Sequence, residues 1–225
     1  MRIKNSIFNL FSLASRLLAE RGLARFPLLG RLHQTFYAKF RPSGIVEAAI
    51  CGLKLRIDAA DPGIAPWLLT GKEFSPAEIR TLERYLKPGM VFVDVGANIG
   101  YFSLIAAQLV GPTGRVYAFE PDEENFKLLS QNIELNNFFW VTAIKKGVAD
   151  KNGHAKFYRD PNNPCRHSLT PNSYEDMVTV EVTTLDNFFA EQTRVDLIKI
   201  DIEGAEPAVL RGMKKSLPVI LNLFW

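Results

Sequence analysis

Residues 91–103 read Val91-Phe-Val-Asp94-Val-Gly96-Ala-Asn98-Ile-Gly100-Tyr-Phe-Ser. The apolar run around Asp94 is typical of a buried strand, and the apolar residues after Gly100 recur at helical spacing. A glycine lets the backbone bend sharply, and the first amides of a helix point toward a ligand. The stretch therefore predicts a strand, a ligand-binding loop and a helix, with Gly96, Asn98 and Gly100 in the loop.

Two acids lie where the ligand of such a loop would be. Asp94 ends the first strand, where its charge would repel a pyrophosphate and attract an ammonium group. Glu120 closes the next apolar run, and a carboxylate there can accept both hydroxyls of a ribose. The loop has two glycines, whereas the dinucleotide-binding fingerprint has three. An amino group and a ribose together describe S-adenosylmethionine as the cofactor.

Strands and helices alternate through the rest of the chain. The segments that predict strands are residues 90–94, 115–120, 141–145, 197–201 and 219–224, and those that predict helices begin at residue 101 or span 123–135 and 205–213. This alternation predicts an α/β fold with a parallel sheet and helices on both faces. Ligands of such sheets bind beyond the carboxyl ends of the strands, where Asp94, Glu120 and Asp201 all fall.

Three motifs in this order resemble the FkbM-type family of S-adenosylmethionine-dependent methyltransferases. They are Asp94-Val-Gly-Ala-Asn-Ile-Gly100, Phe119-Glu-Pro121 and Asp196-Leu-Ile-Lys-Ile-Asp-Ile-Glu-Gly-Ala-Glu206. The resemblance covers roughly residues 45 to 225. It implies the class I methyltransferase fold, which has a Rossmann-like parallel sheet with helices on both faces. Because that sheet normally continues past a fifth strand, we expect this chain to lack the last two strands.

The resemblance also implies roles for individual residues. The methionine end of the cofactor is expected on Asp94, Gly96, Asn98 and Gly100, and the ribose on Glu120. The adenine is expected near residues 147–149, so that Val148 and Asp150 complete the predicted cofactor site.

Methyl transfer to an alcohol requires a group that accepts the hydroxyl proton. The candidates are Asp201 at the end of the fourth strand, His167 in an irregular segment, and Glu203. Acids at a helix start also complement the helix dipole, so Glu203 and Glu206 have a purely structural alternative. We find no set of Asp and Asn residues that indicates a metal site.

The charge distribution separates an arm from a body. Residues 1–41 carry eight Lys or Arg and one acid, whereas the remaining residues carry 19 bases and 23 acids. We expect a basic amphipathic helical arm over 1–41, a hairpin and helix collar over 42–89, and the catalytic domain over 90–225. The arm could contact an anionic membrane surface, or pack on the catalytic domain or a second copy. No apolar run is long enough to span a bilayer, and no signal peptide is apparent.

Three local features complete the prediction. A hairpin is expected over residues 45–58 with its turn at Cys51-Gly52, and a capping box over Ser75-Pro-Ala-Glu78 that starts a helix. Residues 153–184 interrupt the alternation with two strand-like segments, 154–158 and 178–182. They leave from the ligand edge, so we expect them to influence substrate choice.

The sequence thus predicts an O-methyltransferase that modifies a hydroxyl on a sugar, glycolipid or secondary metabolite. A nucleotide-dependent oxidoreductase and an inactive membrane-peripheral scaffold are the alternatives. Nucleic acid is not expected as substrate, because the body is acidic and the segment after the fourth strand lacks the Pro-Pro-aromatic pattern of base-modifying enzymes. Two widely spaced cysteines indicate a reducing, cytoplasmic location.

Overall fold

The computed structural model describes residues 35–160, 163, 167–170, 176–189, 194–202, 204–214 and 219–222. The chain divides into two compact units, residues 1–74 and 75–225. Most of the predicted arm lies outside the described residues, and within residues 35–41 a short helix covers 35–40. The domain limits expected after residues 41 and 89 remain predictions.

The first unit contains the predicted hairpin. Strands β1 (Ile45–Ile50) and β2 (Leu53–Asp58) pair antiparallel, and the turn between them holds Cys51 and Gly52, both with positive φ. Alternate residues of β2 are buried, as expected for a strand with one face on a core. The short helix α3 (Ala65–Leu68) follows.

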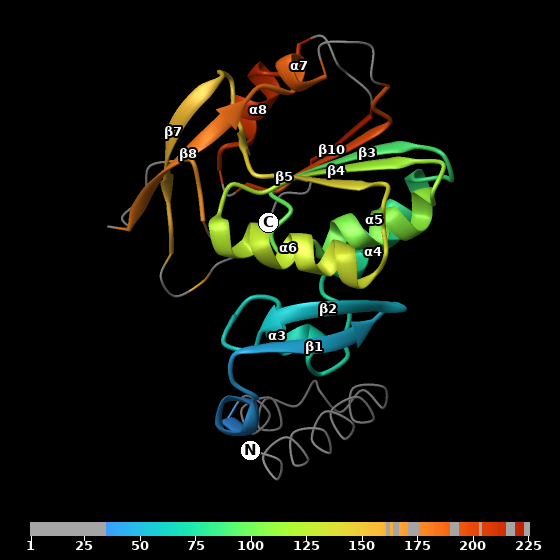
Figure 1. The fold of residues 1–225 in the computed structure, drawn as a ribbon, viewed down its shortest axis with the longest axis vertical. Helices are drawn as coiled ribbons and strands as arrows, with labels where there is room; N and C mark the ends of the chain where they lie inside the picture. The colour runs from blue at the N-terminus through green and yellow to red at the C-terminus, as the bar shows by residue number, and fades with distance from the viewer. Residues whose placement is uncertain are drawn as a thin grey trace. The chain divides into compact units, whose positions relative to one another are not determined.

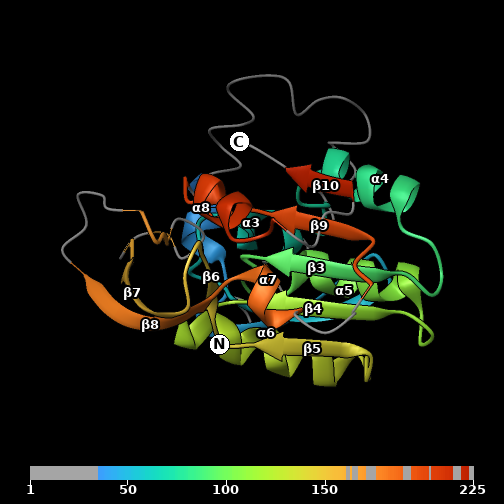
Figure 2. The ribbon, with the colours of Figure 1, turned by 90° about the horizontal axis from the view of Figure 1, so that it is seen from above.

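A parallel sheet forms the centre of the second unit. Its order is β10-β9-β3-β4-β5, and every neighbouring pair is parallel. The arrowheads in Figure 2 accordingly point the same way. The strands are β3 (Val91–Val95), β4 (Arg115–Phe119), β5 (Val141–Ile144), β9 (Leu197–Ile200) and β10 (Val219–Asn222). The predicted parallel α/β fold is confirmed.

Helices cover both faces of this sheet (Figure 1). The helices α4 (Pro76–Tyr85), α5 (Tyr101–Val110) and α6 (Glu123–Leu135) lie on one face, and α7 (Leu185–Phe188) and α8 (Glu206–Arg211) on the other. Because side chains alternate along a strand, Val93 and Val95 join the apolar core beneath α7 and α8. Asp94, between them, points to the opposite face, where Ser103 of α5 contacts it.

The predicted capping box at the start of α4 is wrong. Ser75 precedes the helix in a left-handed conformation, with φ 50° and ψ 65°, and its side chain makes no capping hydrogen bond. An N-cap residue normally has extended backbone angles, which aim its side chain at the third helical amide. Glu78, the other expected member of the box, is buried instead.

The segment between β5 and β9 builds a second sheet, which we call the insert sheet. It consists of β6 (Gly147–Val148), β7 (Gly153–Tyr158) and β8 (Met177–Thr183) in the order β6-β8-β7. The two predicted strands are confirmed and pair antiparallel. In Figure 2 they lie beyond the arrowheads of the central sheet.

No helix in the described part of the chain is long and apolar enough to cross a membrane.

The register between β3 and β9 decides which side chains meet at the site. Asp94 is paired with Lys199, and Val95 with Ile200. Asp196, just before β9, anchors this register through two bonds to Val91. Its backbone amide donates to the Val91 carbonyl at 2.9 Å, and its carboxylate accepts from the Val91 amide at 2.8 Å.

This anchor can be tested with Asp196→Ala and Asp196→Asn. Alanine leaves the Val91 amide without its acceptor, which costs about 1–3 kcal/mol of unfolding free energy. Asparagine keeps an acceptor oxygen, so we expect it to lose much less. Urea unfolding of both variants measures the difference. Equal losses for the two would show that the carboxylate does not anchor the strand through this bond.

Candidate active site

Three acids meet at the carboxyl edge of the central sheet. Asp94 lies near the end of β3, Glu120 directly follows β4, and Asp201 directly follows β9. Because β9, β3 and β4 are neighbours in the sheet, these positions share one edge. The structure thus brings together the acids that the sequence placed there.

The glycine loop is shaped by close contacts with neighbouring elements. Gly96 has φ 82°, and a Cβ at this position would overlap the carbonyl oxygen of Asp201. Gly100 has φ 91°, and its Cβ would lie 2.6 Å from Leu129 Cδ1 of α6. Asn98, at φ 52°, completes the left-handed turn. Gly96 is therefore required by backbone contact as well as by backbone angle, and Gly100 is required by its backbone angle.

Asp94 is fully buried and is engaged on both carboxylate oxygens. Ser103 Oγ donates a hydrogen bond to Oδ2 at 2.7 Å, and Lys199 Nζ lies 3.4 Å from Oδ1. Its predicted role at the methionine end of a cofactor stays a prediction. In this structure the side chain contacts α5 and β9 beneath the loop.

Lys199 is the site residue that the sequence reasoning missed. It is 1% exposed, and its ammonium lies 3.1 Å from Asp201 Oδ2 as well as near Asp94. The ring of Phe102 faces the same ammonium at 4.8 Å. Burial favours the neutral amine, but the charges of Asp94 and Asp201 outweigh it and raise the pKa of Lys199. The signal was a lone cation within Leu197-Ile-Lys-Ile200, an otherwise apolar strand.

Glu120 accepts hydrogen bonds from two backbone amides, one in the glycine loop and one in the turn after β4. The amide of Asn98 donates to Oε2 at 2.8 Å, and the amide of Asp122 donates to Oε1 at 2.9 Å. The residue is 5% exposed, and this burial raises its pKa to about 8 in spite of the two bonds. The carboxyl of Glu120 therefore changes between its protonated and ionised forms near neutral pH.

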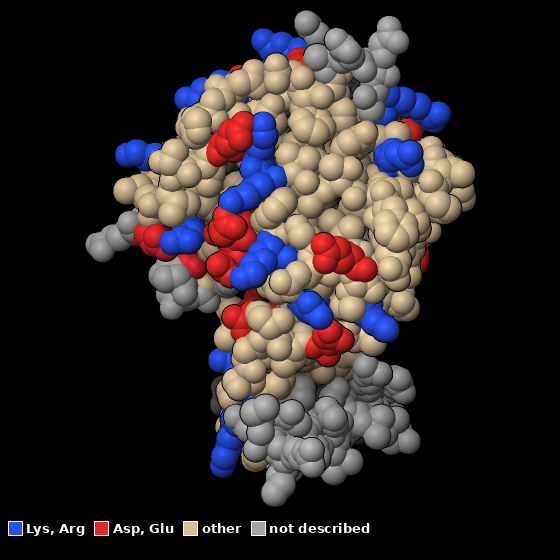
Figure 3. All heavy atoms as spheres, in the orientation of Figure 1, with Lys and Arg blue, Asp and Glu red and all other residues tan. Residues whose placement is uncertain are grey.

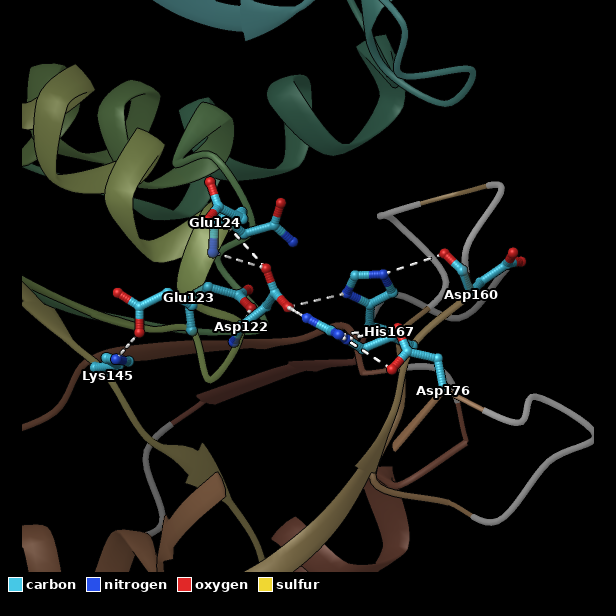
Figure 4. A network of polar contacts seen from close by, with 10 residues as sticks. Asp122, Glu123, Glu124, Lys145, Asp160, His167 and Asp176 are labelled. Carbon is cyan, nitrogen blue, oxygen red and sulfur yellow. Dashed lines mark hydrogen bonds and ion pairs between the residues drawn. The ribbon is translucent and has the colours of Figure 1, made fainter. Parts of the chain in front are cut away.

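His167 lies in a polar network beside the turn between β4 and α6 (Figure 4). Its Nε2 is 3.3 Å from the carbonyl of Asp160, and its Nδ1 is 3.7 Å from the carboxylate of Asp122, which is too long for a hydrogen bond. Burial lowers the pKa of the imidazole, which is only partly offset by the Asp122 charge. A proton-acceptor role for His167 remains a prediction, and the observed contacts link the insert to α6.

Asp122 and Arg159 extend this network. Asp122 caps α6 by accepting from the amides of Glu124 and Asn125 at 3.0 and 3.1 Å. Arg159 lies 4.0 Å from Asp122 and donates to Asp176 at 3.0 and 3.1 Å. The network therefore joins the insert sheet to the element that follows Glu120.

The remaining predicted site residues lie as follows. Val148 is buried in β6, and Asp150 forms an ion pair with Arg211 of α8 at 3.0 Å. Glu203 lies outside the described residues, and Glu206 accepts a bond from the Gly204 amide at 3.1 Å, as a helix-start acid does. Within the described residues, no group of three His, Cys, Asp or Glu could hold a metal ion.

Comparison with known proteins agrees with this geometry. Residues 94–221 match the family described as methyltransferase FkbM domain. Methyltransferase sdnD of Sordaria araneosa is 31% identical over 157 residues, covering 55% of this chain and 60% of that protein. Hexuronic acid methyltransferase AglP of Haloferax volcanii is 28% identical over 141 residues, covering 62% and 56%. The 2-O-methyltransferase NoeI of Sinorhizobium fredii is 25% identical over 150 residues, covering 58% and 60%.

The chain spans about three fifths of the length of these curated relatives. The matched region begins at Asp94 and includes Glu120, Lys199 and Asp201. With more than half of its length matched, the chain belongs to the methyltransferase FkbM domain family, the family of S-adenosylmethionine-dependent methyltransferases that its three motifs resemble.

Proposed function

We propose that this chain transfers a methyl group from S-adenosylmethionine to a hydroxyl group of a sugar or another small molecule. The observation that carries the proposal is the meeting of Asp94, Glu120 and Asp201 at the carboxyl ends of three adjacent parallel strands. The family match supports methyl transfer over the oxidoreductase alternative. The printed names of AglP and NoeI, one a hexuronic acid methyltransferase and the other a 2-O-methyltransferase, support a sugar hydroxyl as acceptor.

The residues present fit the cofactor by their chemistry. Glu120 supplies a desolvated carboxylate that can accept ribose hydroxyls, and glycine at 96 and 100 lets the loop between them pack closely against Asp201 and Leu129. When bound, the cofactor supplies an electrophilic methyl group. In this proposal Val148 and Asp150 lie on the adenine side, as the resemblance implies.

Asp201 is the proton acceptor in this proposal. Its side chain is 36% exposed, whereas that of Asp94 is buried, so Asp201 is the acid of the cluster that an acceptor molecule can reach. With the cofactor bound, the bond from the methyl carbon to sulfur would break as the hydroxyl oxygen bonds to that carbon, and S-adenosylhomocysteine would leave. Asp201 would take the hydroxyl proton, so that the product is a neutral ether. Lys199 holds this carboxylate from below, and alignment of the reacting atoms supplies most of the rate.

Two further expectations belong to the proposal. We keep small molecules and glycan-linked or lipid-linked hydroxyls as acceptors in preference to nucleic acid, since the face drawn in Figure 3 interleaves Lys and Arg with Asp and Glu instead of presenting one sign. Contact of residues 1–41 with a membrane surface is likewise kept as a prediction.

The first prediction concerns cofactor binding. Titration calorimetry of the full chain with S-adenosylhomocysteine should give micromolar affinity, and Glu120→Gln and Asp94→Asn should each weaken it at least about tenfold, since each removes a charge at the strand ends. Glu124→Gln, an exposed acid of the neighbouring α6, is the matched control and should bind normally. A folded wild-type chain that does not bind would remove the basis of the proposed function and favour the scaffold alternative.

The second prediction concerns pH. The carboxylate form of Glu120 accepts ribose hydroxyls, but its pKa of about 8 leaves it mostly protonated at lower pH. Binding must then release a proton, so affinity should rise up to about tenfold for each pH unit between about pH 6 and pH 8, and level off above. Glu120→Gln should flatten this rise. A wild-type profile that is flat over the same range would contradict the assignment of Glu120.

The third prediction separates binding from chemistry. Asp201→Asn should keep S-adenosylhomocysteine affinity within a few-fold but reduce methyl transfer about 100-fold or more, the usual effect of losing a proton acceptor. Transfer of labelled methyl from S-adenosylmethionine to glucuronic acid, with the product identified by NMR as a methyl ether, provides the measurement. Asp186→Asn, outside the site, is the control. Unchanged transfer by Asp201→Asn would assign the proton to another group.

A further inference from the structure

Lys199 occupies a position that the proposed methyl transfer does not by itself explain. It is a fully buried cation on β9, directly beside Asp94 of β3 in the strand register. We propose that Lys199 is a positioning residue whose ammonium keeps Asp94 as a fixed carboxylate beneath the glycine loop and ties Asp201 to it. The functional half of this inference rests on the proposed function.

The surroundings of Asp94 make Lys199 its source of positive charge. Ser103 Oγ donates to one carboxylate oxygen at 2.7 Å, and the ammonium lies 3.4 Å from the other. Ser103 is neutral, so among these two partners only Lys199 compensates the buried charge. A buried carboxylate that loses its compensating cation is strongly destabilised or takes up a proton.

The surroundings of Lys199 fix the ammonium in turn. Asp94 Oδ1 lies 3.4 Å and Asp201 Oδ2 lies 3.1 Å from it, and the Phe102 ring of α5 faces it at 4.8 Å. Glu78 of α4 adds a further negative charge that acts on it. Acidic and aromatic groups from β3, α4, α5 and the residue after β9 thus act on one ammonium.

This arrangement connects Asp94 with the exposed side of the site. Asp201 Oδ2 lies 3.1 Å from the ammonium, and the backbone oxygen of Asp201 abuts Gly96 of the loop. Displacing Lys199 would therefore affect both the loop that is proposed to hold the cofactor and the carboxylate that is proposed to accept the proton.

The charge pairing is tested by the pH dependence of thermal unfolding. In Lys199→Met the buried carboxylate of Asp94 lacks its compensating cation, so a negative charge on Asp94 destabilises the folded state. Stability is then present at low pH and lost as pH increases. We expect the Tm of Lys199→Met to fall, relative to wild type, by about 5 °C or more between about pH 5.5 and pH 8.5. Because the charge of Asp94 also raises the pKa of Glu120, the comparison is made in a Glu120→Gln background, where that titration is absent.

Three further variants make this result specific. Lys199→Arg keeps the cation, and Lys199→Met combined with Asp94→Asn removes the carboxylate that would titrate, so both should follow the wild-type pH profile. Lys127→Met, on the exposed surface of α6, is the control for the substitution itself. A Lys199→Met profile parallel to wild type, or a double variant that remains as pH-sensitive as Lys199→Met, would overturn the pairing.

The positioning role is tested by ligand affinity. At about pH 6, where Lys199→Met retains most of its stability, calorimetry should show S-adenosylhomocysteine affinity at least about tenfold below wild type, with Lys199→Arg restoring part of it. Wild-type affinity in folded Lys199→Met would overturn the positioning role. If the wild type itself fails to bind, the proposed function fails, and the unfolding profiles still decide the pairing.

Discussion

The buried ammonium of Lys199 is the constraint on which the site edge depends. A charge in a protein interior is tolerated when opposite charges lie close and the geometry is fixed. Here the counter-charges come from Asp94 on the neighbouring strand β3 and from Asp201, which lies two residues after Lys199 and directly follows β9. The register of β3 and β9 must therefore be maintained, and Asp196 contributes to it through its two bonds to Val91. The absence of a side chain at Gly96 then lets the loop settle against Asp201.

The acids of the first two motifs, Asp94 and Glu120, have opposite surroundings. Asp94 lies beside an ammonium, whereas Glu120 is bonded by the amides of Asn98 and Asp122. Amides orient a carboxylate but bring no full charge, and burial consequently raises the pKa of Glu120 to about 8. The charge of Asp94 is thus compensated by Lys199, whereas the charge of Glu120 has no ammonium among the contacts described above and can depend on a ligand. This asymmetry suits a site in which one carboxylate shapes the loop and the other meets a polar ligand.

Most of the central sheet could be predicted from the sequence, because apolar strands and amphipathic helices of ordinary length carry clear periodicity. Helix α6 was expected over 123–135 and spans those residues, and the insert strands were also expected. The two-residue β6 and the single-turn α7 are too short to have a period. The predicted capping box was wrong because Ser75 has a left-handed backbone, which the local sequence pattern did not indicate. Lys199 was missed because the pairing that places it beside Asp94 is a property of strand register, which no local pattern contains.

The insert completes the geometry of the edge. His167 contacts the turn after β4 through Asp122, and three residues later Thr170 Oγ1 borders the space beside Gly204, after β9. Residues 167–170 therefore run from the end of one site strand toward the end of another. Two hydrogen bonds from Arg159 to Asp176 join the residue after β7 to the residue before β8, on either side of residues 167–170 in the sequence. Under the proposed function, variation in the insert is expected to change acceptor choice while Asp94, Lys199 and Glu120 stay as they are. The expectation follows from the topology, since the charged residues lie at the strand ends and the insert between β5 and β9 lies beyond these ends (Figure 2).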